Sequence, residues 1–300
     1  MTVTRLTADA YPGLFCAAGK ASASAQKTSL ILSRTNLALL VAGAAFAAVS
    51  SAWQATSGLF AILSAISVAL SLLISIYLKI LAPEHVWYGG RAIAESVKSM
   101  AWRYMMGAEP YFVDLALPEV ERKFVADLKA IFKERQRLAF NLGGQFAEQP
   151  QISTTMRTLR LLTLAERRSA YVADRIVDQK HWYGRQAKSN RESSVTYFYL
   201  VTISQILALV AAFALITHPE SKLKLTGLFT SLAGALLTWV QIKQHKELAQ
   251  AYSVAEFELG LIQEQAQSVA TDQEFSDFVG DAENAISREH TLWIARRDKT

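Results

Sequence analysis

The chain has 300 residues, of which 51% are apolar and 19% are charged, and its formal net charge is +5 at pH 7. Its one cysteine, Cys16, has no second cysteine to pair with. This excludes an internal disulfide and fits a reducing compartment. The apolar fraction is only slightly high, so what matters is where the apolar residues gather along the chain.

Four stretches without a charged residue follow in chain order, at about 37–53, 58–78, 195–217 and 225–242. A helix needs roughly 20 apolar residues to cross the hydrocarbon core, where lipid offers no partner for a backbone polar group. We therefore predict an all-α membrane protein with two transmembrane helical hairpins, four spans in all, at about 37–78 and 195–242. Long cytoplasmic helical or coiled-coil extensions complete the predicted fold, as two modules at 1–150 and 151–300. The first stretch starts too far along the chain for a signal peptide, so we interpret it as a retained helix.

Basic residues gather on one side of the predicted spans. Of the 31 Lys and Arg residues, only Lys222 and Lys224 lie in the two short loops within the hairpins. The positive-inside rule therefore predicts that both termini and the middle region are cytoplasmic. Residues 79–194 carry a net charge of +6 and residues 243–300 a net charge of −5. We favour packing between these regions, or the positive-inside bias alone, over an acidic partner or anionic lipid.

The regions between the spans have helical patterns. Pro118 predicts a helix that starts near Glu119, and Gly143 with Gly144 predicts its end near Asn141. The apolar face of this helix comprises Val120, Phe124, Leu128, Ile131 and Leu138. A further helix is predicted from the cap region at 153–155 into the third span. Because no segment alternates with a period of two, we expect little or no sheet.

The second span contains a stripe of serines. They fall within a narrow arc at about 100° per residue, and the candidate residues are Ser64, Ser67, Ser71 and Ser75. Such a stripe either packs helices together through small residues or forms the wall of a water-filled pore opened in an oligomer. We favour packing, and the two interpretations are compatible because a gated pore is a packed seam when it is closed.

The fourth span contains a heptad pattern that continues beyond it. Steps of four and three residues lead from Gly227 to Val269, as in a coiled coil. The first part of this seam is small or polar, comprising Gly227, Ser231, Gly234, Thr238 and Gln241, and the later part is mostly apolar. Small residues let helices approach closely in lipid, where hydrophobicity cannot drive them together. We therefore predict one helix from about Leu225 to Val269 that packs along this face. If the chain opens a pore, we expect Gly234, Thr238 and Gln241, together with the serine stripe of the second span, to face it in the open state.

Chemical motifs are missing from the sequence. The absence of charge in the spans argues against a proton or metal pump, and against a strong charge filter in any pore. The five histidines have no metal-ligand spacing, and no nucleotide-binding loop, nucleophile elbow or paired-cysteine motif is present. We expect no enzymatic activity and no cofactor.

The residues that flank the hairpins resemble a bacterial family. The first set comprises YPGLFCAAGKASASAQ (Tyr11 to Gln26) and WYGGRAIAESVKSMAWRYMMGAEPY (Trp87 to Tyr111). The second comprises Arg175, DQKHWYGRQA (Asp178 to Ala187), HKELAQAYSVAEFEL (His245 to Leu259) and FVGDAENAISREHTLWIARR (Phe278 to Arg297). Together they resemble a tandem of SLATT domains, the SMODS- and SLOG-associating two-transmembrane effector modules. The family-motif candidates are Trp87, Arg91, Glu95, Trp102, Trp182, Arg185, Glu289 and Trp293.

The resemblance implies a membrane effector of a bacterial anti-phage or conflict system. Such an effector is expected to form a pore in the inner membrane, or to disrupt it, when a nucleotide-signalling partner triggers it. The expected partners are the lipid bilayer, further copies of the chain and a sensor protein, and no nucleic acid. The alternative is a membrane-tethered scaffold whose cytoplasmic helices recruit a partner without conductance.

Overall fold

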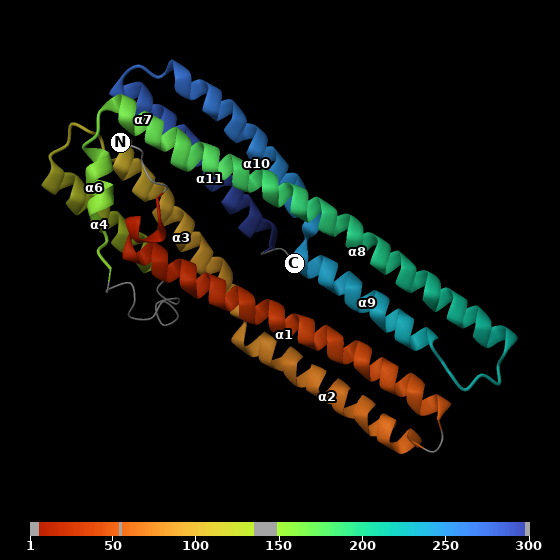
Figure 1. The fold of residues 1–300 in the computed structure, drawn as a ribbon. Coiled ribbons are helices and arrows are strands. Elements are labelled where there is room, and N and C mark those ends of the chain that lie inside the picture. Colours follow the sequence, from red (N-terminus) through yellow and green to blue (C-terminus); the bar gives the residue numbers. More distant parts are fainter. Residues whose placement is uncertain (1–5, 54–55, 135–148, 298–300) are drawn as a thin grey trace. The chain divides into compact units, whose positions relative to one another are not determined.

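The computed structural model describes residues 6–53, 56–134 and 149–297, and in 288–297 it defines the backbone alone. Every regular element in these ranges is helical and none is a strand, which confirms the predicted all-α class. A π-helix, η5 (Val172–Val177), lies between α7 and α8. The α-helices are α1 (Gly13–Ala52), α2 (Ser57–Leu81), α3 (Pro83–Met106), α4 (Leu117–Glu134), α6 (Thr154–Arg160), α7 (Leu164–Tyr171), α8 (Asp178–Thr217), α9 (Thr226–Lys243), α10 (His245–Gln265) and α11 (Asp272–Arg297) (Figure 1).

Three stretches of the described chain are long and apolar enough to cross a membrane. By length and composition they are α1, α2 and the continuous stretch Leu164–Thr217, which comprises α7, η5 and α8. The fourth predicted span corresponds to α9, which has 18 residues and is not among them. Its Gly, Ser, Thr and Gln residues lower its mean hydropathy. The four-span arrangement therefore stays a prediction.

The predicted single helix from Leu225 to Val269 is wrong. Gln244 has a positive φ of 48°, and its N–H donates to the Val240 carbonyl, so α9 ends at Lys243 and α10 begins at His245. The heptad spacing did not reveal this break, because no glycine or proline marks a position where the backbone leaves the helix. A non-glycine residue in the left-handed region costs about 1–2 kcal/mol, so tertiary contacts must support the joint.

The order of elements repeats along the chain. α1 and α8 each have 40 residues. Each is followed by a second helix, then one residue with positive φ, then a third helix: α2, Ala82 and α3 in the first half, α9, Gln244 and α10 in the second. At Ala82, φ is 40° and the N–H donates to the Leu78 carbonyl. This repeated order is what a tandem of two related modules is expected to have.

The predicted helix that leads into the third span is interrupted once. Ser153 caps α6 by accepting from the Met156 amide, as the sequence suggested. However, α6 ends at Arg160, and Thr163 starts α7 with a capping box that includes Glu166. The extra start arises because Thr163 and Glu166 have the spacing of a capping box. From Leu164 onward the helix is continuous to Thr217.

The chain divides into two compact units. The hairpin unit comprises residues 27–83 and 187–250, and the helical body comprises residues 1–26, 84–186 and 251–300. α1, α8 and α10 each continue from one unit into the other. Within the hairpin unit, α1 and α2 lie side by side, as do α8 and α9 (Figure 1).

The core of the helical body is rich in aromatic rings. Trp102 and Tyr171 are fully buried, with ring centroids 5.5 Å apart, and Tyr171 also packs edge-on against Phe275. Val120, Phe124 and Leu128 of α4 are buried, which confirms that part of its predicted apolar face, while Ile131 is half-buried. Leu138, Gly143 and Gly144, and with them the predicted end of this helix, lie outside the described residues.

Replacing Gly90 with alanine will lower the stability of the helical body by about 1–3 kcal/mol. A Cβ at Gly90 would lie 3.0 Å from the Ala18 carbonyl oxygen and 3.2 Å from the Ser22 nitrogen, both backbone atoms of α1. α1 and α3 would have to separate, and the 2.8 Å bond from Ser22 Oγ to the Trp87 carbonyl would stretch. Gly19 is the matched control, because nothing lies within 4 Å of a Cβ there and alanine in mid-helix gains about 0.5–1 kcal/mol. Equal melting temperatures of the two variants would contradict the close α1–α3 packing.

Candidate functional site

The serine stripe of α2 lies against α1. Ser64 Oγ donates to the Gly43 carbonyl at 2.8 Å, and Ser71 Oγ donates to Asn36 Oδ1 at 2.5 Å. Asn36 Nδ2 in turn donates to Ser75 Oγ at 3.1 Å. Ser67 is buried and bonds to the carbonyl of Leu63 in its own helix. In this structure the stripe is thus the packing seam of the first hairpin, with its hydroxyl groups satisfied.

The small and polar stripe of α9 has a different environment. Gly227, Gly234, Thr238 and Gln241 are exposed, while Ser231 is half-buried. Nothing lies within 4 Å of a Cβ built at Gly227 or Gly234. α9 buries Ala233 and Trp239 instead. In a single copy of the chain this face of α9 is therefore open to its surroundings, and its role as a packing seam or a pore wall stays a prediction.

The later half of the same heptad pattern does pack. Tyr252, Ala255 and Leu259 of α10 are buried, and the Tyr252 ring lies 5.4 Å from Trp182 and 5.6 Å from Tyr183. The two halves of the pattern thus differ in environment on either side of Gln244. A heptad pattern alone does not tell whether its face meets the same chain or another molecule.

The polar groups of the second hairpin mostly bond within their own helices. Thr202 and Ser204 donate to carbonyls four residues earlier in α8, and Thr230 and Thr238 do the same in α9. Such local bonds satisfy a hydroxyl group but do not tie two helices together. The side-chain bonds that cross the first hairpin do tie α1 to α2.

A cluster of aromatic and basic side chains surrounds Trp239 in the hairpin unit. Trp239 Nε1 donates to Tyr197 Oη at 3.0 Å, which joins α9 to α8. The Arg34 guanidinium of α1 lies 4.7 Å from the Trp239 ring centroid, and Lys243 Nζ lies 6.0 Å from it. Tyr197 also stacks on His245. Cation–π contacts are worth about 0.5–2 kcal/mol, so Arg34 links the first hairpin to the second beside the joint at Gln244.

The family-motif candidates are spread over the helical body. Trp87 and Trp102 of α3 are buried, and Arg91 and Glu95 are half-buried. In α8, Trp182 packs on Tyr252, and Arg185 is exposed. The side chains of Glu289 and Trp293 lie outside the described part of α11.

A buried ion pair forms the polar centre of the helical body. Arg175 Nη2 donates to Glu283 Oε2 at 2.6 Å, and Arg175 Nε donates to Oε1 at 2.8 Å, with both side chains fully buried. Tyr171 Oη donates to the same carboxylate at 2.9 Å. Burial lowers the pKa of nearby Lys98 to about 8, and the positive charge of Arg175 acts in the same direction.

No sequence motif marks Arg175 and Glu283 as a pair. Arg175 lies in the π-helix η5, and π-turns often accompany functional positions. A signal for Glu283 exists, since it lies on α11 among the buried residues Val279, Ala282 and Ile286. Arg175 is named in the family resemblance, as is the run that contains Glu283, but nothing in the sequence pairs two residues that are 108 positions apart.

Three arginines hold the loop after α3. Arg160 Nη1 donates to the Tyr104 and Tyr111 carbonyls, both at 2.8 Å. Arg167 donates to the Met106 carbonyl and pairs with Asp272. Arg103 donates to the Glu109 carbonyl at 3.0 Å. These charge-assisted bonds give the loop, which belongs to the GAEPY end of the first motif run, a structural role.

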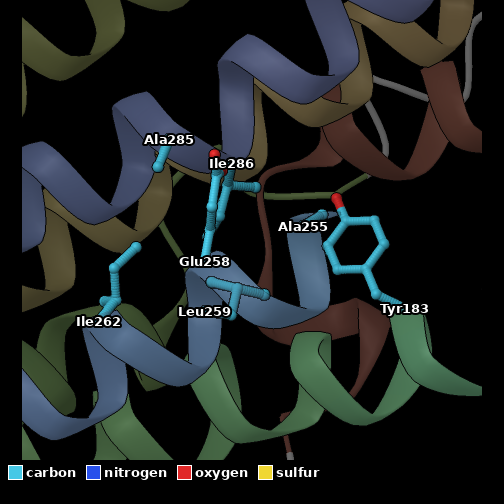
Figure 2. Close-up of a pocket in the computed structure, with 7 residues that line it drawn as sticks. All are labelled: Tyr183, Ala255, Glu258, Leu259, Ile262, Ala285 and Ile286. Atoms are coloured by element: carbon cyan, nitrogen blue, oxygen red, sulfur yellow. The ribbon is translucent and has the colours of Figure 1, made fainter. Parts of the chain in front are cut away.

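Neither a metal site nor a metabolite pocket is found in two features of the described residues, the groups of potential metal ligands and the cavity beside α10. No group of three His, Cys, Asp or Glu side chains among them is placed to hold a metal ion. A small apolar cavity between α8, α10 and α11 is lined by Tyr183, Leu259 and Ile286 among others (Figure 2). It has room for about one water molecule, so it is too small for a metabolite.

The fold therefore defines a class: an all-helical chain with membrane-length apolar helices, built as two modules of the same order. Models of two effector domains match it, "SMODS and SLOG-associating 2TM effector domain 3" over residues 12–168 and "SMODS and SLOG-associating 2TM effector domain 1" over residues 171–293. The chain belongs to this SLATT family and carries two of its domains in tandem, which confirms the resemblance. No curated protein and no solved structure matches the chain.

Proposed function

We propose that the chain is a membrane effector of a bacterial anti-phage or conflict system that assembles into homo-oligomers and opens a pore in the inner membrane. The family description names two-transmembrane effector domains associated with SMODS and SLOG proteins. The proposal places four spans in the bilayer, with both termini in the cytoplasm, as the distribution of Lys and Arg favours. It assigns no catalytic step and no cofactor to the chain.

The observation that carries the proposal is the open face of α9. Gly227, Gly234 and Thr238 leave this face without a partner in one copy of the chain. Small residues let helices approach closely in lipid, and the Gln241 amide is costly there unless it meets another polar group or water. Assembly satisfies both conditions, because the stripe then meets its counterpart in a second copy or lines a water-filled lumen.

The length of α9 agrees with this role. Its 18 residues are about 27 Å long at 1.5 Å per residue, close to the roughly 30 Å of the hydrocarbon core. A short helix with one polar face is poorly suited to lipid on all sides. α2 differs, since its serine stripe is already covered by α1. We therefore assign the pore-facing surface to α9 and a packing role to the α2 stripe.

The trigger is proposed to reach α9 from a nucleotide-signalling partner through α10. The two helices are joined by Gln244 alone. The cation–π contact of Arg34, from α1, with Trp239 supports the end of α9 beside this joint, and we assign this arrangement to the closed state. A partner that displaces α10 would therefore act on α9 directly.

Dye release from liposomes tests the proposal. We expect purified protein to release entrapped dye increasingly steeply as the protein-to-lipid ratio rises, because assembly then substitutes for the trigger. Expressing cells should lose membrane potential. If protein whose measured mass shows an oligomer releases no dye at any ratio, the proposed pore is wrong.

The second candidate is a membrane-tethered scaffold without conductance. It is favoured by the exposed apolar residues of α10, Val254, Phe257 and Leu261, since such residues suit protein binding. Replacement of both hairpins by unrelated transmembrane helices distinguishes the two. A scaffold keeps its function after this replacement, whereas a pore loses it.

A further inference from the structure

α10 has two apolar faces. Its inner face contains Tyr252, Ala255 and Leu259, which are buried, and packs on Tyr183 of α8 and toward Ile286 of α11 (Figure 2). A helix that served only to complete the helical body would need no second apolar face, because its outer side would meet water.

The outer face of α10 contains three large apolar side chains in the open. Val254, Phe257 and Leu261 are 57%, 68% and 53% exposed. Their spacing of three and four residues places them on one stripe, which we call the α10 stripe. α10 has the charged residues Lys246, Glu247, Glu256, Glu258 and Glu264, a net charge of −3. At 100° per residue, Glu258 and Glu264 fall on opposite edges of the stripe. Both are exposed, and Glu258 also lines the small cavity beside Ile286 (Figure 2).

The negative charge of α10 argues against two binding partners for the stripe, an anionic membrane surface and a second copy of α10. An anionic membrane surface repels the glutamates, and the nearest cations along the chain, Lys243 and Lys246, precede the stripe by two turns or more. Lys180 of α8 also reaches α10, but its ammonium group donates to Gln263 at 3.0 Å, and at 100° per residue Gln263 lies on the side of α10 away from the stripe. A second α10 stripe would bring glutamates against glutamates, and like charges across a helix pair are unfavourable. A helix with an apolar seam and basic edges meets both features of the surface, since its seam covers the apolar residues and its edges pair with Glu258 and Glu264.

We propose that the α10 stripe is the docking surface for a basic amphipathic helix of a partner protein. The mode is helix against helix, with Phe257 as the central anchor. Only the effect of binding rests on the proposed function: in a pore-forming protein, the bound partner would act on α9 through Gln244. Binding itself is independent of any pore.

Two synthetic peptides test the surface on the full-length protein in nanodiscs of phosphatidylcholine. Both have three heptads with leucine at the seam, and one has lysine and the other glutamate at the flanking positions. We expect the lysine peptide to bind at least about tenfold more tightly than the glutamate peptide in fluorescence anisotropy. Equal affinities, or no binding of either peptide, would overturn the proposal.

Substitutions locate the binding on the protein. Phe257→Ser should lower the affinity for the lysine peptide about tenfold or more. The double charge change Glu258→Lys with Glu264→Lys should reverse the preference toward the glutamate peptide. Val125→Ser on α4 is the matched control, because Val125 is also exposed, at 48%, but lies on another helix. Its binding should equal that of the unchanged protein, and a loss as large as that of Phe257→Ser would overturn the assignment.

Two further outcomes separate this proposal from others. If Phe257→Ser reduces the oligomer mass while the peptides fail to bind, the stripe is an interface between copies of the chain and the proposal falls. If the peptides bind as expected but dye release fails under all conditions, the docking surface stands and the pore falls.

Discussion

Replacement of Glu283 by alanine will destabilise the helical body by about 3–5 kcal/mol, the range for breaking a buried ion pair from one side. The guanidinium of Arg175 would lose both of its bonds to the carboxylate, at 2.6 and 2.8 Å, in a position without contact with water. Arginine does not shed its charge in proteins, so the cation would remain buried. Tyr171 would also lose the acceptor of its hydroxyl group.

Thermal unfolding of the purified protein measures this loss. At about 2–4 °C per kcal/mol for a unit of this size, the melting temperature should fall by roughly 6–20 °C. Glu121→Ala is the control for a more exposed pair, since Arg157 lies 2.7 Å from Glu121 with 44% of its side chain exposed. Glu121→Ala should lower the free energy of unfolding by at most about 1 kcal/mol. The double change Arg175→Met with Glu283→Leu should recover most of the stability, because neither charge of the pair is then left buried without its partner. Equal losses for Glu283→Ala and Glu121→Ala would contradict this description of the core.

Replacement of Gly234 by leucine will abolish dye release, or lower it by about tenfold or more, while the folded chain keeps its stability. Nothing lies within 4 Å of a Cβ at Gly234, so a single copy has room for the side chain. In an oligomer the same side chain would separate the α9 helices or block the lumen. The measurement is the rate of release at a fixed protein-to-lipid ratio, together with the melting temperature.

Two controls separate assembly from folding. Leu237 is an exposed residue of α9 outside the stripe, and Leu237→Val should leave release unchanged. Gly43→Leu should lower stability instead, because a Cβ there already lies 3.2 Å from Val68 Cγ2 and 3.6 Å from the Ser67 Cβ. Full release from the Gly234→Leu variant would show that this face does not meet another copy or the lumen.

The sequence allowed the helical class and three of the four membrane-length stretches to be predicted, because a long apolar run can be recognised from composition without tertiary information. It also revealed both stripes, since helical spacing depends on sequence alone. It did not tell that α2 is covered by α1 while α9 is open, because the same small residues suit a contact within one chain and a contact between chains. The environment of a stripe depends on the whole fold.

Two further features depended on long-range structure. Gln244 is an ordinary helix-forming residue in its local sequence, yet it takes a positive φ at the end of α9. The partner of Arg175 lies 108 positions away, and a π-turn positions that arginine in the core. Local propensity and spacing predict neither feature, because tertiary packing decides both.

Cysteine accessibility in the assembled protein tests the central claim most directly. Cys16 is the sole cysteine of the chain, and Cys16→Ser provides a background for single-cysteine variants. In liposomes that release dye, a charged methanethiosulfonate reagent should change the rate of release of the Thr238→Cys variant and leave that of Ser67→Cys unaltered. Modification that affects Ser67→Cys and spares Thr238→Cys would place the water path along α2 and contradict the account.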